Sequence, residues 1–141
     1  MKQRKFRVFA PLSPADRARL LLLVRPRFEN VFCFGVTYAY GVSENYPFPD
    51  SEAELVLDGH HVGSGHEALT GLLRQGAGVP ARWRPDGKII HVTLSTVYGV
   101  PPVRAGEIEP YAIMPIRPIS CRVRLARSFA EVYRPVRADA A

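Results

Sequence analysis

Three side chains with useful chemistry alternate along one short, β-prone stretch, residues 89–95. His91, Thr93 and Ser95 occupy every second position, and the residues between them are apolar. In an extended strand alternate residues share a face, so one imidazole and two hydroxyls should point the same way. An imidazole can transfer a proton, and hydroxyls can hold a phosphate oxygen. The plainer interpretation is a strand whose polar face meets solvent.

A similar stretch occurs earlier in the chain. Residues 34–42 read FGVTYAYGV, and residues 90–100 read IHVTLSTVYGV. Both contain an apolar residue, a variable one, Val and Thr, and both reach Tyr-Gly-Val soon afterwards. Two similar strands half a domain apart indicate two related halves that meet at a cleft. The alternative is a chance likeness between two β-prone strands.

These residues give the sequence its resemblance to the two-histidine (2H) phosphoesterase superfamily, which includes phosphodiesterases of RNA ends and cyclic phosphates. The signature of that superfamily is a His-hydrophobic-Thr/Ser-hydrophobic strand in each half. Residues 91–94, HVTL, resemble the second copy, and residues 35–38, GVTY, take the place of the first, with Gly35 where a histidine belongs. The resemblance covers roughly residues 5–105, and the motifs themselves are short.

The resemblance implies a phosphodiesterase site that needs neither metal nor cofactor. In the superfamily two imidazoles flank a phosphodiester, one as base and one as acid, while the paired hydroxyls hold the phosphate. It therefore implies catalytic roles for His91, Thr93 and Thr37, and it makes Gly35 a vacated catalytic position. Losing one acid–base catalyst typically costs on the order of 10²- to 10⁴-fold in rate.

Three classes of function remain open from the sequence. The first is a phosphodiesterase of RNA ends, 2′,3′-cyclic phosphates or cyclic oligonucleotides. The second is a degenerate member that binds a nucleotide or RNA phosphodiester without efficient hydrolysis. The third is a protein-interaction domain with no such ligand. We rank a degenerate or weakened two-histidine protein first and leave its catalytic activity open.

The remaining histidines lie close together in the sequence GHHVGSGHE. One of His60, His61 and His66 could replace the missing catalyst if it reached the vacated position. A metal site is a further alternative, but the spacing of these residues and Glu67 matches no strong zinc pattern. The sequence favours a polar surface loop here.

Other side chains near the two motif strands are weaker candidates for ligand binding. Basic residues around the turn before the second motif could contact phosphate, and aromatic residues could stack on a base. Exposed turns and core packing are the commoner roles for such residues. The candidates are Ser95, Tyr38, Tyr40, Tyr98, Arg82, Trp83, Arg84 and Lys88.

The overall charge is basic, with 19 Lys and Arg against 13 Asp and Glu, a net charge of +6 and a pI near 9.7. This balance favours a polyanionic partner such as a nucleotide or RNA, and a solvated strand face with a basic tail is the alternative. No apolar run is long enough to span a membrane, and the basic N-terminus lacks the apolar region of a signal peptide. We therefore expect a cytoplasmic protein, with Cys33 and Cys121 reduced in the core.

The hydrophobic pattern predicts one α+β domain over residues 1–141. Ser13 is the expected N-cap of a helix that runs to about Val24. A polar turn is predicted at 59–65, a loop at 105–110, and a last half-turn at 128–133 before a frayed end. Strands are predicted at 5–10, 31–40, 53–58, 67–73, 89–95, 111–116 and 119–126. Together with the resemblance, the expected fold is a two-lobed, mostly antiparallel sheet with a covering N-terminal helix and a central cleft.

Overall fold

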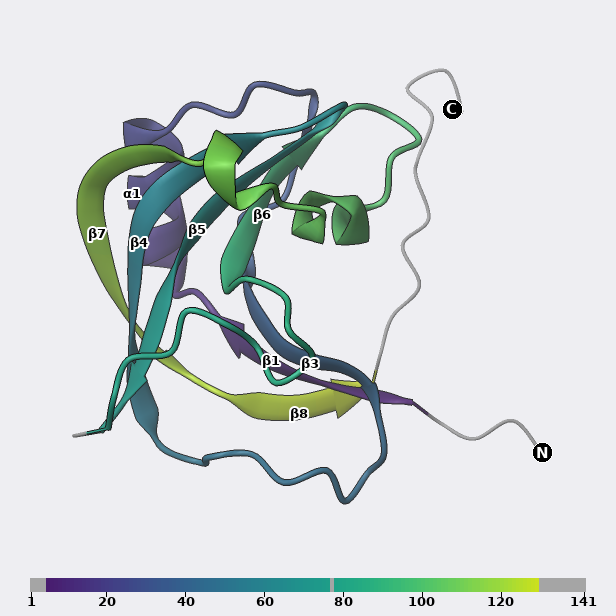
Figure 1. Ribbon diagram of the computed structural model, residues 1–141, viewed down its shortest axis with the longest axis vertical. Coiled ribbons are helices and arrows are strands. Elements are labelled where there is room, and N and C mark those ends of the chain that lie inside the picture. The colour runs from purple at the N-terminus through teal and green to yellow at the C-terminus, as the bar shows by residue number, and fades with distance from the viewer. Residues whose placement is uncertain (1–4, 77, 130–141) are drawn as a thin grey trace.

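The computed structural model describes residues 5–76 and 78–129 and confirms an α+β fold with an antiparallel sheet (Figure 1). One α-helix, α1 (Pro14–Leu23), and two 3₁₀ helices, η1 (Pro102–Gly106) and η2 (Pro110–Ala112), accompany the sheet. The eight strands of the described residues are β1 (Phe6–Pro11), β2 (Asn30–Val31), β3 (Gly35–Val42), β4 (Glu52–Val62), β5 (His66–Gln75), β6 (His91–Thr96), β7 (Met114–Arg124) and β8 (Ala126–Phe129).

The sheet curls so that its two outermost strands, β7 and β8, are consecutive in the chain. Its strand order is β7-β4-β5-β6-β3-β1-β8, and β2 pairs with β6 beside this path. Only Leu125 separates β7 from β8, so consecutive residues pair first with β4 and then with β1. Figure 1 shows β7 bending around the molecule and continuing into β8. The two similar strands of the sequence, β3 and β6, are neighbours in this sheet.

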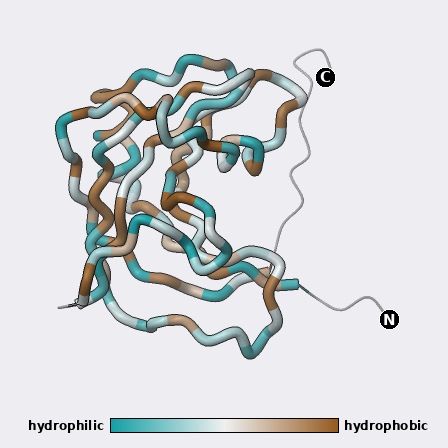
Figure 2. The backbone as a smooth tube through the Cα atoms, in the orientation of Figure 1, coloured by the Kyte–Doolittle hydropathy of each residue, from teal (hydrophilic) through white to brown (hydrophobic). Residues whose placement is uncertain are grey.

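The hydrophobic core lies on the concave side of the curled sheet and includes one residue of α1. Valine, leucine and isoleucine side chains from β1, β3, β4, β5 and β6 meet there, and Leu125 joins them from the β7–β8 junction. Figure 2 shows hydrophobic and hydrophilic stretches alternating along the chain, as strands with one buried face require.

The helix begins and ends where the sequence predicts. The Ser13 hydroxyl accepts a hydrogen bond from the Asp16 amide at 3.1 Å, and Pro14 occupies the first turn. The helix covers less of the sheet than predicted, because only Leu20 is fully buried and the Leu22 side chain is 80% exposed. Its apolar face is therefore narrower than its composition suggests.

Several predicted boundaries are wrong for local reasons. The predicted strand 31–40 is divided into β2 and β3, because Cys33 adopts a positive φ of 61° between them. The two strands predicted at 111–116 and 119–126 are mainly one, β7, which runs through Pro118. Proline is tolerated there because Pro118 lies where the pairing with β4 is interrupted, between Ile119 and Pro115, and no strand of the described residues pairs with the other edge of β7.

The predicted loop and tail segments also differ from the structure. The loop expected at 105–110 carries the end of η1 and the start of η2. Of the half-turn expected at 128–133, residues 128 and 129 belong to β8, and the others lie outside the described residues.

Two β-bulges determine which side chains reach the polar face of the sheet. In β4 the register skips Asp58 between Leu57 and Gly59, against both β5 and β7. In β6, Ser95 pairs with Glu67 and Thr93 with Ala68, which leaves one β6 residue extra. A bulge puts two residues of one strand opposite one of its partner, so alternation changes face at each of these points.

Candidate functional site

One face of β3 and β6 carries three of the residues that the sequence singles out. The two strands pair antiparallel at Val36 and Val92, which are both fully buried in the core. The next residue on each strand, Thr37 and His91, therefore points away from the core. Thr93 shares that face with His91, because it is two positions further along β6. The structure thus brings Thr37, His91 and Thr93 onto one surface.

His91 is held in one orientation and is 7% exposed. Its Nδ1 lies 2.8 Å from the carbonyl oxygen of Ile89, and because a carbonyl only accepts, Nδ1 carries the proton. Nε2 of the neutral ring is therefore a free base. Burial lowers the pKa of His91 below its ordinary value, and the cations of Arg84 and Lys88 lower it further, against the opposing effects of the Ile89 carbonyl and Asp86.

The 3₁₀ helix η1 lies over the β6 part of this row, His91 and Thr93. The Thr93 hydroxyl donates to the Pro102 carbonyl at 3.2 Å, and a β-carbon built on Gly106 would lie 3.3 Å from Cε1 of His91. A side chain at position 106 would therefore crowd the Cε1 and Nε2 edge of the imidazole. Thr37 is half-buried on β3.

Ser95 does not belong to this row, contrary to the simple alternation. The bulge in β6 turns it to the other face, where its hydroxyl donates to the Glu67 carboxylate at 2.6 Å and accepts from the Phe28 amide at 3.1 Å. The His60 Nε2 lies 2.7 Å from the second Glu67 oxygen, and the Arg27 amide donates to the first at 2.9 Å. This buried network holds residues 27 and 28, which follow α1, against β5 and β6.

Gly35 has no room for a side chain. A β-carbon at this position would lie 2.1 Å from the Ala10 carbonyl oxygen and 2.7 Å from the Phe9 ring. Gly35 also pairs with Pro11 at the end of β1. A histidine here would need a shift of the β1 backbone.

Two of the three basic candidates, Arg82 and Arg84, are paired with carboxylates, whereas Lys88 forms no ion pair with a described residue. Arg82 forms two hydrogen bonds with Asp58, at 3.0 and 2.9 Å, and this contact lowers the pKa of that carboxyl. Arg84 is buried and contacts Asp86 at 2.5 Å. Lys88 is exposed and lies beside Gly106 near His91. Lys88 is therefore the cation best placed to meet an anion at this face.

The tyrosine candidates lie away from the row. Tyr38 packs against the hydrophobic core, where burial raises its pKa. Tyr98 follows β6 at the far end of the strand, where its amide donates to Glu29 at 2.7 Å. Tyr40 is exposed further along β3.

The predicted polar loop of histidines is wrong, because β4 extends to Val62 and β5 starts at His66. His60 points toward Glu67, on the face opposite His91. His61 lies in the row His61, Ala68, Thr93, two strands away from β6, or roughly 10 Å. His66 pairs with Thr96, near the other end of β6 from His91. None of the three lies beside His91.

His61 and His66 form a stacked pair of their own. Their ring centroids are 5.9 Å apart with an interplanar angle of 25°, and both residues are more than nine-tenths buried. Burial is the main cause that lowers the pKa of each ring. The Nδ1 atom of each has no hydrogen-bond partner among the described residues. Gly63 allows this packing, since a β-carbon there would lie 2.1 Å from the His66 ring.

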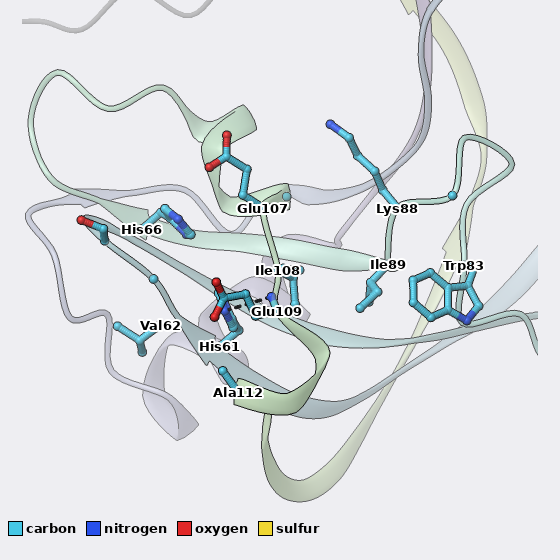
Figure 3. Close-up of a pocket in the computed structure, with 14 residues that line it drawn as sticks. His61, Val62, His66, Trp83, Lys88, Ile89, Glu107, Ile108, Glu109 and Ala112 are labelled. Atoms are coloured by element: carbon cyan, nitrogen blue, oxygen red, sulfur yellow. Dashed lines mark hydrogen bonds between the residues drawn. The ribbon is translucent and has the colours of Figure 1, made fainter.

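A cavity of about 690 Å³ opens in front of this pair and reaches the neighbourhood of His91 (Figure 3). The β4–β5 hairpin, the turn before β6 and the segment between η1 and η2 form its walls. Figure 3 shows Trp83 and Lys88 on one side of it, and His61, His66 and Glu109 on the other. Its polar and aromatic lining is His61, Ser64, His66, Trp83, Lys88, Glu107 and Glu109.

Sequence reasoning missed the acidic side of this cavity. Glu109 donates its amide to Nε2 of His61 over a long 3.4 Å contact, and its carboxylate accepts from the Tyr111 hydroxyl, which raises the pKa of Tyr111. Glu107 forms a 3.4 Å ion pair with Arg104. No local motif marks these residues, because they enter the site through the fold of residues 101–113 over the sheet.

Comparison with known protein families, curated proteins and solved structures found no match to this chain. Within the described residues no three His, Cys, Asp or Glu side chains gather as metal ligands do. No helix in the same part of the chain is both long and apolar enough to cross a membrane.

Proposed function

We propose that the protein is a 2H-phosphoesterase-like protein that binds a nucleotide or RNA phosphodiester on the face of β3 and β6. The observation that carries the proposal is the antiparallel pairing of Val36 with Val92, since it puts Thr37, His91 and Thr93 on one surface. In this proposal the Thr37 hydroxyl donates to a phosphate oxygen, and the Thr93 hydroxyl does the same when it exchanges its bond to the Pro102 carbonyl for the ligand. Nε2 of neutral His91 meets a ligand hydroxyl, and Lys88 supplies positive charge.

The same geometry supports weak turnover at most. A neutral His91 can take a proton from an attacking oxygen, but the departing oxygen needs a proton as well. None of the other histidines stands beside His91, and Gly35 has no space for one. We therefore expect binding with slow hydrolysis or none. The two-lobed fold with a central cleft, which the resemblance implies, is part of the same proposal.

The two cysteines fit the cytoplasmic location that we propose. Cys33 and Cys121 are both free and buried. Burial raises the pKa of the Cys33 thiol to about 11, so it stays protonated and unreactive at neutral pH.

Calorimetry and product analysis with 2′,3′-cyclic nucleotides and a short RNA that ends in a cyclic phosphate test the proposal. We expect the wild-type protein to bind, and His91→Ala to weaken binding roughly tenfold, in line with the loss of one hydrogen bond to a charged group. Thr93→Val should weaken it as well, whereas Arg117→Ala, an exposed change on β7, should not.

Two results would contradict the proposal. One is that no phosphate ligand binds, which would favour the protein-interaction alternative. The other is that Arg117→Ala and His91→Ala weaken binding equally, since this would reduce the interaction to non-specific attraction by a basic protein.

A further inference from the structure

The cavity beside His91 combines an aromatic ring, one cation and two carboxylates, of which Glu107 is paired with Arg104. Trp83 is 54% exposed at its edge, and Lys88 follows from the same turn. Glu109 lies across the cavity from both (Figure 3). Stacking surfaces next to a basic group are what single-stranded nucleic acids and nucleotides require of a protein. The volume of about 690 Å³ also lies within the usual range of small-molecule sites.

Apart from Glu107, which is paired with Arg104, the charges in the cavity are separated. Lys88 and Ile89 border both the cavity and His91, whereas Glu109 lies on the side of His61. A phosphate is favoured at the Lys88 end and repelled at the Glu109 end. The Glu109 end instead suits a neutral group with N–H donors, because an ionised carboxylate only accepts hydrogen bonds.

At the Glu109 end, the unused hydrogen-bonding capacity belongs to the Glu109 carboxylate. Nδ1 of His61 and Nδ1 of His66 have no partner within the described residues, but both atoms are sealed from the cavity, so neither contacts a ligand there. The Glu109 carboxylate is bonded only in part, since the Tyr111 hydroxyl fills one of its several acceptor positions.

We infer that this cavity is a nucleobase subsite that prefers guanine. The inference rests on the proposed function, because it extends the phosphodiester ligand from His91 past Lys88 into the cavity. The base stacks on Trp83, and its Watson–Crick edge meets Glu109. Guanine presents a ring N–H and an exocyclic amino group side by side, so it can donate twice to one carboxylate. Uracil presents one such donor and cannot.

Intrinsic fluorescence tests stacking directly, because Trp83 is the single tryptophan of the chain. Four test compounds distinguish binding of the base from binding of the phosphate. They are guanosine 2′,3′-cyclic phosphate, its uridine counterpart, guanosine, and ribose 5-phosphate. We expect the guanosine ligands to quench Trp83 emission, and ribose 5-phosphate to bind by calorimetry without quenching. The guanosine cyclic phosphate should bind roughly tenfold more tightly than the uridine one.

Variants show which residues cause the tight binding and the preference for guanine. Trp83→Leu should lower affinity for guanosine cyclic phosphate about tenfold, and Trp83→Phe should recover most of the loss, because phenylalanine also stacks. Glu109→Gln should reduce the guanine preference, whereas Glu44→Gln, on an exposed residue outside the cavity, should leave it unchanged. Trp83→Phe also serves as the folded control if Trp83→Leu is unstable.

The two proposals fail in different ways. Equal affinity for the guanosine and uridine cyclic phosphates, with emission unchanged in the bound state, would overturn the base subsite while leaving phosphate binding intact. If ribose 5-phosphate does not bind and His91→Ala has no effect, the phosphodiester proposal fails. Quenching by guanosine that Glu109→Gln reduces would still support the cavity as a base site.

Discussion

At the scale of single residues, the candidate site depends on side chains that are held in one conformation. His91 has one ring nitrogen bound to the carbonyl of Ile89, and Gly106 lies against its edge. A fixed tautomer suits proton transfer or phosphate recognition, because no ordering cost remains to be met on binding. Thr37 and Thr93 add hydroxyls on the same face.

Gly35 leads to a prediction about stability. Gly35→Ala should lower the free energy of unfolding by on the order of 3 kcal/mol, because its β-carbon would collide with backbone and with an aromatic ring. Gly99→Ala is the matched control, since Gly99 has a positive φ of 87° but open space around it, and should cost about 1 kcal/mol. Urea denaturation of the three proteins measures both values. Equal losses would mean that space at Gly35 is not the constraint.

At this scale the sequence predicted His91 and Thr93 correctly as neighbours on one face, because strict alternation holds between them. It placed Ser95 wrongly, since a bulge is a property of two strands and their register rather than of one tetrapeptide. It also treated Gly35 as a missing histidine alone. The contact with Ala10 is invisible until β1 and β3 are paired.

At the scale of elements, the buried Glu67 network joins β5, β6, β4 and the chain after α1. The Glu67 carboxylate accepts from Ser95 Oγ and from the Arg27 amide, and it also contacts His60. The residue is 1% exposed. An ionised group at such a depth is tolerated only with nearly every acceptor position used.

This network gives the second prediction. Glu67→Gln should destabilise the protein by on the order of 3 kcal/mol, because it removes the charge that its donors are arranged around. Ser95→Ala should cost about 2 kcal/mol, since it leaves the carboxylate and the Phe28 amide each short of a partner. Chemical denaturation measures both changes.

The double variant of Glu67→Gln and Ser95→Ala should lose less than the sum, as residues in one network are coupled. Ser120→Ala, an exposed serine on β7, is the control and should change stability little. Strict additivity of the two single changes would show that Glu67 and Ser95 act independently.

The elements themselves were predicted unevenly. The N-cap at Ser13 and the helix after it follow from local signals, and so does β5. The length of β4 does not, because Gly59 and the two histidines after it resemble a turn in sequence. They are held in a strand by pairing with β5 on one side and, as far as His60, with β7 on the other.

At the scale of the whole molecule, closure of the sheet could not be predicted. It depends on β7 and β8 acting as one bent strand that pairs with β4 and then β1, which no sequence window contains. Closure also neutralises part of the basic C-terminal stretch. Arg122 contacts Glu52, and Arg124 contacts Asp50, so the charge excess there is smaller than the sequence suggested.

Three buried histidines give the molecule a stability that depends on pH. The pKa values of His61, His66 and His91 are all lowered from the ordinary 6.5, mainly by burial. The unfolded chain therefore binds protons at a higher pH than the folded protein does. The stability that these three histidines contribute is present above pH 6.5 and is lost as the pH falls below it.

Two carboxylates, Asp58 and Glu29, affect stability in a more acidic range. Asp58 and Glu29 have pKa values lowered from 3.8 and 4.5, so the stability that they contribute is present above those values and is lost only in more acidic solution. The range from pH 6.5 down to pH 5 therefore reports mainly on histidines.

We predict that the free energy of unfolding falls between pH 7.5 and pH 5, by at most about 1.4 kcal/mol per pH unit for each of the three histidines. Urea denaturation at a series of pH values measures the slope. His66→Gln should make the slope shallower, because it removes one proton that only the unfolded chain takes up readily. A stability that stays level or rises on acidification across this range would mean that these imidazoles accept protons in the folded state.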